Sequence, residues 1–229
     1  ADLGEADAVE ALEAMNRPVA AVAREDGYHQ DRASQMVSEV VADGLADGAR
    51  VADLCAAPGG KATAVASMGA AVVAADLRQR RLNLVRSNAE GLGLKLGLVV
   101  ADGRRPPLRP GSFDRVLVDA PCSGLGVLRR RADSRWRVKP DDVAELADLQ
   151  VGLLNAALPL VAPGGLLVYS VCTLTAAETT GVDERFREAT GAVPAGPLST
   201  PWRAHGAGGL LLPQDLDAEG MAVFRYEVA

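Results

Sequence analysis

Short apolar runs alternate with longer segments of helical periodicity along most of this chain. The runs predict strands over residues 50–55, 71–76, 96–101, 114–119 and 165–172. The segments between most of them predict helices over 60–68, 77–91 and 141–160. Strand–helix alternation at this spacing is typical of βαβ units with right-handed crossovers. The pattern therefore predicts an α/β fold with a parallel sheet.

The two ends of the chain follow other patterns. Residues 5–24 are rich in Ala and Glu, which predicts a helical segment, and Asp31 is placed to N-cap a helix over about 32–45. After the last predicted strand we expect a helix near 176–190 and then a Pro- and Gly-rich stretch from 191 to 209. Two short apolar runs, 210–212 and 221–228, are expected to form a closing antiparallel pair at one edge of the sheet.

Composition fits one large α/β domain, with or without a short appendage, because 229 residues with 48% hydrophobic residues can bury a sizeable core. The net charge is −6 and the pI is about 5.0, which argues against a broadly basic surface that coats nucleic acid. A local basic run at 129–139 departs from this balance. It is interpreted either as a solvated face or as a track for phosphates.

The three cysteines carry the first chemical signal. There is no zinc-type CxxC spacing, no signal peptide and no apolar run approaching ~20 residues, so we expect a reducing cytoplasm, no metal and no membrane. Thiols in that setting are more often small buried hydrophobes than catalysts. Cys122 and Cys172, however, each follow an apolar run, and the carboxyl ends of parallel strands open into the ligand crevice. This placement indicates covalent chemistry, whereas Cys55 is expected to be structural.

A glycine-containing loop follows the first predicted strand, with the sequence DLCAAPGGK over residues 53–61. Its glycines let a ligand approach the backbone closely, and the helix start behind it offers unpaired N–H groups. The spacings GxGxxG and GxxxxGK[ST] are both absent, which disfavours nicotinamide and nucleoside triphosphate cofactors.

Acidic residues end the next two predicted strands. Asp76 is placed to accept hydrogen bonds from a ribose diol, and Asp102 can accept from an adenine amino group. Together with Asp53 they favour a neutral or cationic nucleoside, such as S-adenosylmethionine, over a pyrophosphate. The alternative is that each carboxylate only caps the following helix. Arg81 is expected either to reach the cofactor or a phosphate, or to lie on the surface.

Four segments, in this order, resemble the Nop/Sun (RsmB-type) family of RNA cytosine carbon-5 methyltransferases: DLCAAPGGK (53–61), DGR (102–104), FDRVLVDAPCSG (113–124) and LVYSVCTL (167–174). The likeness extends over roughly residues 28–229. Within it, QDRASQ (30–35) resembles the start of the family's catalytic domain, and the tail near 220–224 resembles its closing strand. The combination is far more specific than any single piece.

The resemblance implies a doubly wound, Rossmann-like class I methyltransferase fold, with a mainly parallel seven-stranded sheet whose last strand is antiparallel. It assigns residues 28–229 to the catalytic domain and 1–27 to an N-terminal helical segment, a remnant of the family's N-terminal region. The implied cofactor is S-adenosylmethionine. We expect it to be bound by Cys55, Ala56, Ala57, Pro58, Gly59, Gly60, Lys61, Asp76, Arg81, Asp102, Gly103, Asp119 and Pro121.

The implied reaction is methyl transfer to carbon 5 of a cytidine in rRNA or tRNA. By resemblance, Cys172 is the nucleophile that adds as a thiolate to carbon 6, and Cys122 assists release. Asp119 is placed to hydrogen-bond the base, where a protonated or proton-sharing carboxyl would stabilise charge developing on the ring. Lys61 is expected either to orient the site and help lower a thiol pKa, or to be a solvated lysine.

RNA is the expected partner of a chain that is expected to act as a monomer in the cytoplasm. Trp136 is expected either to stack on a base or to pack internally. The candidate track for RNA phosphates directly follows the Cys122 loop and comprises Arg129, Arg130, Arg131, Arg135, Trp136 and Arg137.

Three features depart from the family's pattern. Val171 stands where the family usually has threonine, and residues 175–179 read TAAET in place of a stretch with proline, glutamate and asparagine. Only 11 residues separate Pro18, in a landmark-like Asn-Arg-Pro, from Gln30, where family members carry a small RNA-contacting subdomain. Two alternatives therefore stay open: a methyltransferase of the same fold that acts on a protein or small molecule, and a module that binds cofactor or RNA without turnover.

Overall fold

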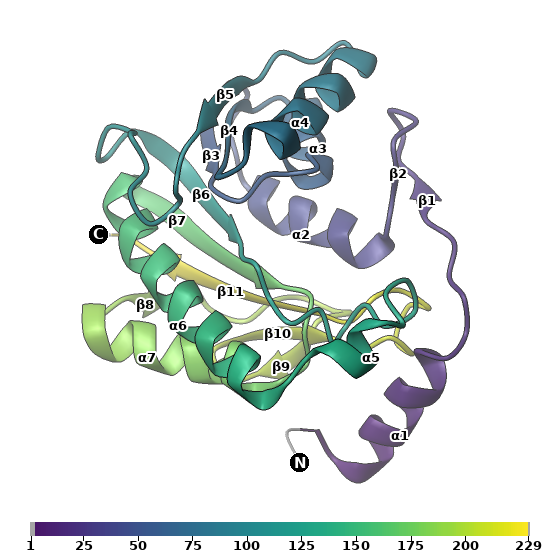
Figure 1. The fold of residues 1–229 in the computed structure, drawn as a ribbon. Helices are drawn as coiled ribbons and strands as arrows, with labels where there is room; N and C mark the ends of the chain where they lie inside the picture. The colour runs from purple at the N-terminus through teal and green to yellow at the C-terminus, as the bar shows by residue number, and fades with distance from the viewer. Residues whose placement is uncertain (1–2, 229) are drawn as a thin grey trace.

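A mainly parallel β-sheet forms the centre of the molecule (Figure 1), for which a computed structural model describes residues 3–228. Five strands run parallel and lie side by side in this order: β5 (Gly97–Val100), β4 (Ala71–Asp76), β3 (Arg50–Asp53), β6 (Phe113–Asp119) and β7 (Val161–Val171). They correspond to the five apolar runs of the sequence. The first strand of this sheet along the chain, β3, lies in the middle, and later strands are added on both sides of it. The sheet is therefore doubly wound, as predicted.

Antiparallel strands complete the sheet. β11 (Met221–Glu227) pairs with β7 on one side and with β10 (Gly208–Leu211) on the other, while the short β9 (Arg203–His205) and β8 (Val193–Pro194) bring the total to nine. The predicted antiparallel pair is therefore present, and the last strand is antiparallel. The pair closes the side of the sheet beyond β7, with only the short β9 outside it, and the sheet has nine strands where seven were predicted. β11 is the inner strand of the pair and is buried at nearly every position. A strand that is covered on both faces has a continuous apolar sequence rather than alternating apolar and polar residues.

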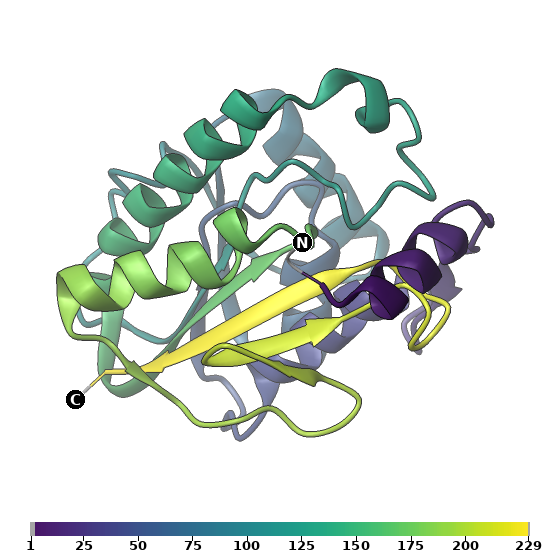
Figure 2. The same ribbon diagram turned by 90° about the horizontal axis from the view of Figure 1, so that it is seen from below.

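Helices cover both faces of the sheet (Figures 1 and 2). α2 (Arg32–Ala42), α3 (Gly60–Ser67) and α4 (Gln79–Gly91) pack on one face, and α6 (Pro140–Ala157) and α7 (Thr180–Thr190) on the other. α2 begins where the sequence predicts, because the Asp31 side chain accepts a hydrogen bond from the Ala33 N–H at 2.9 Å. Each face has its own apolar core cluster, so the sheet is sandwiched between two helical layers.

α6 and the 3₁₀ turn η1 (Leu158–Leu160) that follows it form an unusually apolar segment. Residues 140–160 are long and apolar enough to cross a membrane by length and mean hydropathy, and no other described helix is. This segment was not identified from the sequence. Within α6, Ala147, Leu153 and Leu154 are buried against the sheet. A helix in the core of an α/β domain has the same character.

α1 (Glu5–Ala14) is shorter than the helix predicted over 5–24, and a small hairpin of β1 (Val22–Ala23) and β2 (His29–Gln30) follows it. Pro18 lies just past the helix end, where its missing N–H and fixed φ disfavour continuation. Figure 2 shows α1 beside the loop that leads into β11. There the Arg203 guanidinium forms an ion pair with Asp7 at 2.8 Å.

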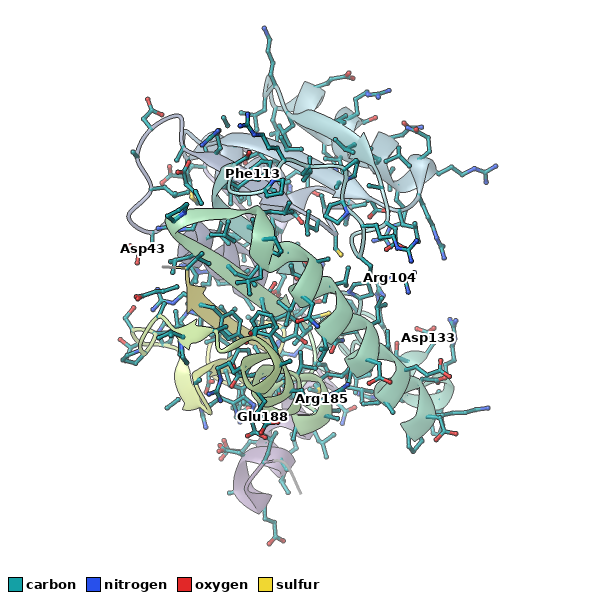
Figure 3. The ribbon with its side chains drawn as sticks, turned by 90° about the vertical axis from the view of Figure 1, so that its left-hand side faces the viewer. Asp43, Arg104, Phe113, Asp133, Arg185 and Glu188 are labelled. Atoms are coloured by element: carbon teal, nitrogen blue, oxygen red, sulfur yellow. The ribbon has the colours of Figure 1, made fainter. Side chains whose placement is uncertain are left out.

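The predicted site residues lie on loops at the carboxyl ends of the parallel strands. In Figure 3, Arg104 and Asp133 mark this carboxyl edge, on the opposite side of the molecule from Asp43 and Phe113 at the amino edge. Five loops meet at the carboxyl edge, one after each parallel strand. The fold therefore brings together residues that are far apart in sequence.

Candidate active site

Two thiols meet at the carboxyl edge. Cys122 lies in the loop after β6, and Cys172 directly follows β7, its parallel neighbour, with Asp119 opposite Ser170 in the register. Because the two strands end side by side, the sulfur atoms lie 3.3 Å apart and in hydrogen-bonding contact. Both residues remain partly accessible. The structure thus brings both cysteines together at one point of the carboxyl edge.

The contact between the thiols has opposite effects on them. The hydrogen bond from Cys122 lowers the pKa of Cys172, with help from the Lys61 ammonium and against burial and the nearby Asp119 carboxylate. The same hydrogen bond, together with burial, raises the pKa of Cys122 well above its usual value. Cys172 is therefore the sulfur that ionises, and Cys122 is the one that keeps its proton. Nucleophilic thiols require this low-pKa environment.

A partly buried ion pair lies beside the thiols. The Lys61 ammonium, on the first turn of α3, donates to a carboxylate oxygen of Asp119 at 2.8 Å, and the Ser170 hydroxyl donates to the other oxygen at 2.8 Å. Burial lowers the pKa of Lys61, but its pairing with Asp119 outweighs this and leaves the pKa raised. Lys61 is therefore a charged site residue rather than a solvated lysine.

The glycine-containing loop is fastened to α4. Gly59 has a φ of 109°, and a Cβ there would lie 3.0 Å from the Val85 Cα, so only glycine fits without strain. The Arg81 guanidinium donates to the Ala57 carbonyl at 2.7 Å and faces Asp76 at 3.8 Å. Arg81 thus holds the loop in shape, and its predicted contact with a cofactor or phosphate stays a prediction.

The three strand-end acids differ in how their oxygens are used. Asp76 accepts from the Ala57 and Arg78 N–H groups, and Asp102 accepts from Arg104, which lowers the pKa of Asp102 to about 2. One oxygen of Asp53 accepts from the Cys55 N–H at 3.2 Å, but the other is buried without a partner. Burial and the neighbouring Asp119 carboxylate raise the pKa of Asp53 to about 7. An orphaned buried carboxylate oxygen beside this loop fits a cationic ligand group.

The remaining loop residues have supporting positions. Burial raises the pKa of Cys55 well above its usual value, in keeping with a structural thiol. Gly103 lies against Leu54 and Leu153, where a Cβ would come within 2.7 Å of the Leu153 side chain. The Pro121 carbonyl accepts a hydrogen bond from Gln150 of α6 at 2.8 Å. Among the residues from 3 to 228, no group of three or more His, Cys, Asp or Glu side chains is arranged to bind a metal.

Glu178 was not anticipated from the sequence. It ends the 3₁₀ turn η2 (Ala176–Glu178), is fully buried, and links both thiol loops. It accepts from Ser123, next to Cys122, through N–H and hydroxyl at 2.8 and 2.5 Å, and from Thr173, next to Cys172, at 3.1 Å. Gln150 also donates to it at 3.1 Å. In the weakly matching TAAET stretch, nothing in the local pattern marks a glutamate as buried.

Gly126 is the second residue that the sequence reading missed. Its N–H donates to the Cys172 carbonyl at 3.0 Å, and its carbonyl accepts from the Gly220 N–H at 2.9 Å. A Cβ at this position would lie 2.4 Å from the Gly220 oxygen and 2.9 Å from the Cys172 oxygen. The Cys122 loop can therefore pack against the backbone of Cys172 only with glycine here.

The first two arginines of the predicted RNA track are internally engaged. The Arg129 side chain is 1% exposed, ion-paired to Asp217, and donates to the Ala14 carbonyl at 2.8 Å. The predicted RNA contact is therefore wrong for Arg129, which anchors α1. Arg130 is exposed but ion-paired to Glu219.

The rest of the track faces solvent. Trp136, on the short helix α5 (Ser134–Arg137), is 88% exposed, which rules out internal packing. Arg131 is exposed, Arg137 pairs with exposed Asp133 at 3.1 Å, and Arg135 also donates to the Met15 carbonyl at 3.2 Å. For Arg130, Arg131, Arg135, Trp136 and Arg137, contact with RNA stays a prediction.

A family model and individual proteins match this chain. Residues 42–221 match the model described as 16S rRNA methyltransferase RsmB/F. A Mycobacterium tuberculosis (H37Rv) protein named as a candidate methyltransferase is 46% identical over 180 residues, covering 75% of this chain and 39% of its own length. The ribosomal RNA small subunit methyltransferase B of Salmonella paratyphi B is 43% identical over 148 residues, covering 63% of this chain and 34% of its own length. The chain therefore spans well under half the length of these relatives.

A solved structure shares the whole fold. The crystal structure of PH0851 superposes with a TM-score of 0.84 at 26% identity, covering 99% of this chain and 57% of that one. The sheet, both helical layers and the loops at the carboxyl edge are thus those of an architecture known from experiment.

Proposed function

This chain belongs to the 16S rRNA methyltransferase RsmB/F family, and from that premise we propose that it transfers a methyl group from S-adenosylmethionine to carbon 5 of a cytidine in RNA. The observation that supports this chemistry is the thiol pair, with sulfur atoms 3.3 Å apart and pKa values pushed in opposite directions. Methyl transfer to an oxygen or an exocyclic nitrogen needs no such pair. Carbon 5 of cytosine is a poor nucleophile and needs covalent activation.

In the proposed reaction, the Cys172 thiolate forms a bond to carbon 6 of the cytosine ring. The ring electron pair that this displaces makes carbon 5 nucleophilic, and carbon 5 would take the methyl group as the sulfur–methyl bond of the cofactor breaks and leaves S-adenosylhomocysteine. We expect the Lys61–Asp119 pair to hydrogen-bond the polar edge of the base and stabilise the charge that develops on the ring. Bonding to carbon 6 removes the charge on Cys172 that favours the protonated form of Cys122, so Cys122 can release its proton to solvent and, as a thiolate, take the proton from carbon 5. The electron pair left at carbon 5 re-forms the double bond to carbon 6 and expels Cys172 as its thiolate.

The carboxyl edge also holds the residues proposed to bind the cofactor, which supplies an electrophilic methyl group when bound. The loop 55–61 would contact it through backbone groups, and Asp76 and Asp102 would face its ribose and adenine. Asp53 has the one orphaned buried oxygen of the three acids and would face its cationic amino acid portion. Pairing a buried acid with a cation offsets the cost of ionising it.

Methyl transfer to RNA is tested by incubating the full chain with unmethylated 16S rRNA transcript and S-adenosylmethionine, followed by bisulfite sequencing. We expect protection of one or a few cytidines, loss of protection in Cys172→Ala, and retention in the matched control Cys55→Ala. Methyl incorporation into protein or a small molecule instead would favour a different acceptor. Cofactor binding without any transfer would favour a module without turnover, and either result contradicts the proposal.

Cofactor affinity should weaken as the pH falls through about 7. The pKa of Asp53 is raised to about 7, so the carboxylate is ionised and available to a cation above that pH and neutral below it. A bound cation favours the ionised form, which predicts proton release on binding in the same range. Calorimetric titration with S-adenosylhomocysteine at several pH values measures both effects. Asp53→Asn should bind more weakly and lose the pH dependence; an unchanged profile in this variant would assign the effect to another group.

A further inference from the structure

Positive charge is concentrated in one part of this acidic protein. Residues 77–109 contain eight Lys or Arg residues and two Asp or Glu, a net of +6, in a chain whose 24 basic and 30 acidic residues give −6. The rest of the chain therefore carries −12. Neither the cofactor site nor the 129–137 segment accounts for this asymmetry. Clustered charge of one sign on an oppositely charged protein points to a partner.

Five of these arginines gather at the carboxyl edge and are called the basic rim: Arg78, Arg80, Arg81, Arg104 and Arg105. The strand ends that position them are adjacent, because the Ala101 N–H donates to the Asp76 carbonyl at 3.1 Å. The Arg78 N–H bonds to Asp76 at 3.0 Å, and the Arg104 N–H bonds to Asp102 at 2.9 Å. Figure 3 shows nitrogen-tipped side chains projecting around the labelled Arg104 on this side of the molecule.

Most of the rim's charge is unused within the chain. Arg81 faces Asp76 and Arg104 pairs with Asp102. Among the described residues, the side chains of Arg78, Arg80 and Arg105 form no ion pair or hydrogen bond, and all three are exposed. Arg105 is near enough to Asp102 to help lower the pKa of that carboxyl, but it is not paired with it. Three guanidinium groups without a bonded partner at one edge repel one another, and an anion between them would relieve that repulsion. The proposed cofactor carries a sulfonium and an ammonium against one carboxylate, so it is a cation and cannot be that anion.

We propose that the basic rim is a phosphate-binding surface for the RNA substrate, separate from the 131–137 segment; this rests on the proposed function. The rim follows β4 and β5, and the thiols follow β6 and β7. Three strand spacings of roughly 4.8 Å separate the β4 and β7 ends, so the rim lies about 14 Å from the thiol pair. An RNA strand with its target cytidine at Cys172 would have phosphates a few nucleotides away at the rim. Arginine is well suited to this contact because its planar fork binds phosphate oxygens in pairs.

The test compares two triple variants with the same charge change. The rim variant is Arg78→Gln/Arg80→Gln/Arg105→Gln, and the control is Arg50→Gln/Lys95→Gln/Arg109→Gln, three exposed basic residues toward the amino edge. The affinity for a fluorescein-labelled single-stranded fragment of 16S rRNA is measured by anisotropy over a range of KCl concentrations. Because each phosphate contact to a single strand contributes roughly 0.7 to the salt slope, we expect the rim variant to lose about 2 from that slope. Its affinity at low salt should fall about tenfold or more, with the control unchanged.

The outcomes separate this inference from the proposed function. If wild type methylates RNA and the rim variant keeps the wild-type salt slope, the rim is not an RNA surface although the activity stands. Equal losses in both variants would show only a general charge effect and overturn the inference as well. Rim-dependent binding to phosphatidylglycerol vesicles, with RNA affinity unaffected, would assign the rim to an anionic membrane instead. Cofactor affinity should be unchanged in the rim variant, because Arg81 and the strand-end acids are intact.

Discussion

Cys122→Ala should accumulate a covalent complex with RNA containing 5-azacytidine, whereas Cys172→Ala should form none. The two sulfurs lie 3.3 Å apart, so a ring bonded to Cys172 places its carbon 5 within reach of Cys122. Without Cys122, the bond to carbon 6 can still form but its release is impaired. Without Cys172, the nucleophile is missing, and we expect Cys122 not to replace it, because burial still raises the pKa of its thiol when the hydrogen bond to Cys172 is gone. Denaturing electrophoresis of protein with labelled RNA separates the two outcomes.

The matched control for both variants is Cys55→Ala, since Cys55 lies in the cofactor loop and its thiol is structural. It should trap RNA as wild type does. If Cys122→Ala accumulates no more covalent RNA complex than Cys55→Ala does, Cys122 has no role in release. Trapping by Cys172→Ala would show that another residue is the nucleophile, and the assignment of Cys172 to that role would be wrong.

The sequence predicts the parallel half of the fold well because each strand there is a continuous apolar run bounded by turn residues. β4 matches its predicted range at both ends, and α2 starts at its predicted cap, Asp31. The antiparallel half is less predictable. Whether β11 lies at the edge or between β7 and β10 depends on long-range pairing, and the local pattern of a buried strand is the same in both places.

The site residues also divide into those that the sequence predicts and those that depend on distant contacts. Cys122, Cys172 and Asp119 stand at strand ends, so topology alone brings them to one edge. Arg129 is different, because its neighbours in sequence predict a solvated basic run. Its side chain is instead buried, where it donates to the Ala14 carbonyl at the end of α1, more than a hundred residues away. Local charge patterns carry no information about such a distant partner, and for that reason the prediction fails there.

Glu178→Ala should destabilise the protein by about 3 kcal/mol or more, because it leaves several buried donors without an acceptor. Ser123, Thr173 and Gln150 all donate to this carboxylate, which is one of the links between the two thiol loops. A purely structural loss would lower only the melting temperature. Since the carboxylate bonds to the residues next to both cysteines, we expect its loss to loosen the contact between the sulfurs and to have a second effect: a higher pKa for Cys172, as the hydrogen bond from Cys122 weakens.

Two measurements check these effects: thermal unfolding, and the pH dependence of iodoacetamide alkylation at Cys172 under conditions where the variant is folded. Glu188→Ala is the matched control, since Glu188 is an exposed glutamate on the neighbouring α7 and is visible at the surface in Figure 3. Glu178→Gln keeps one acceptor oxygen but turns an amide N–H₂ toward donors, so it should fall between wild type and Glu178→Ala. If Glu178→Ala loses stability but alkylates at Cys172 with the wild-type pH profile, the carboxylate supports the fold without positioning the thiols. If it unfolds at the same temperature as Glu188→Ala, the buried network does not hold the loops at all.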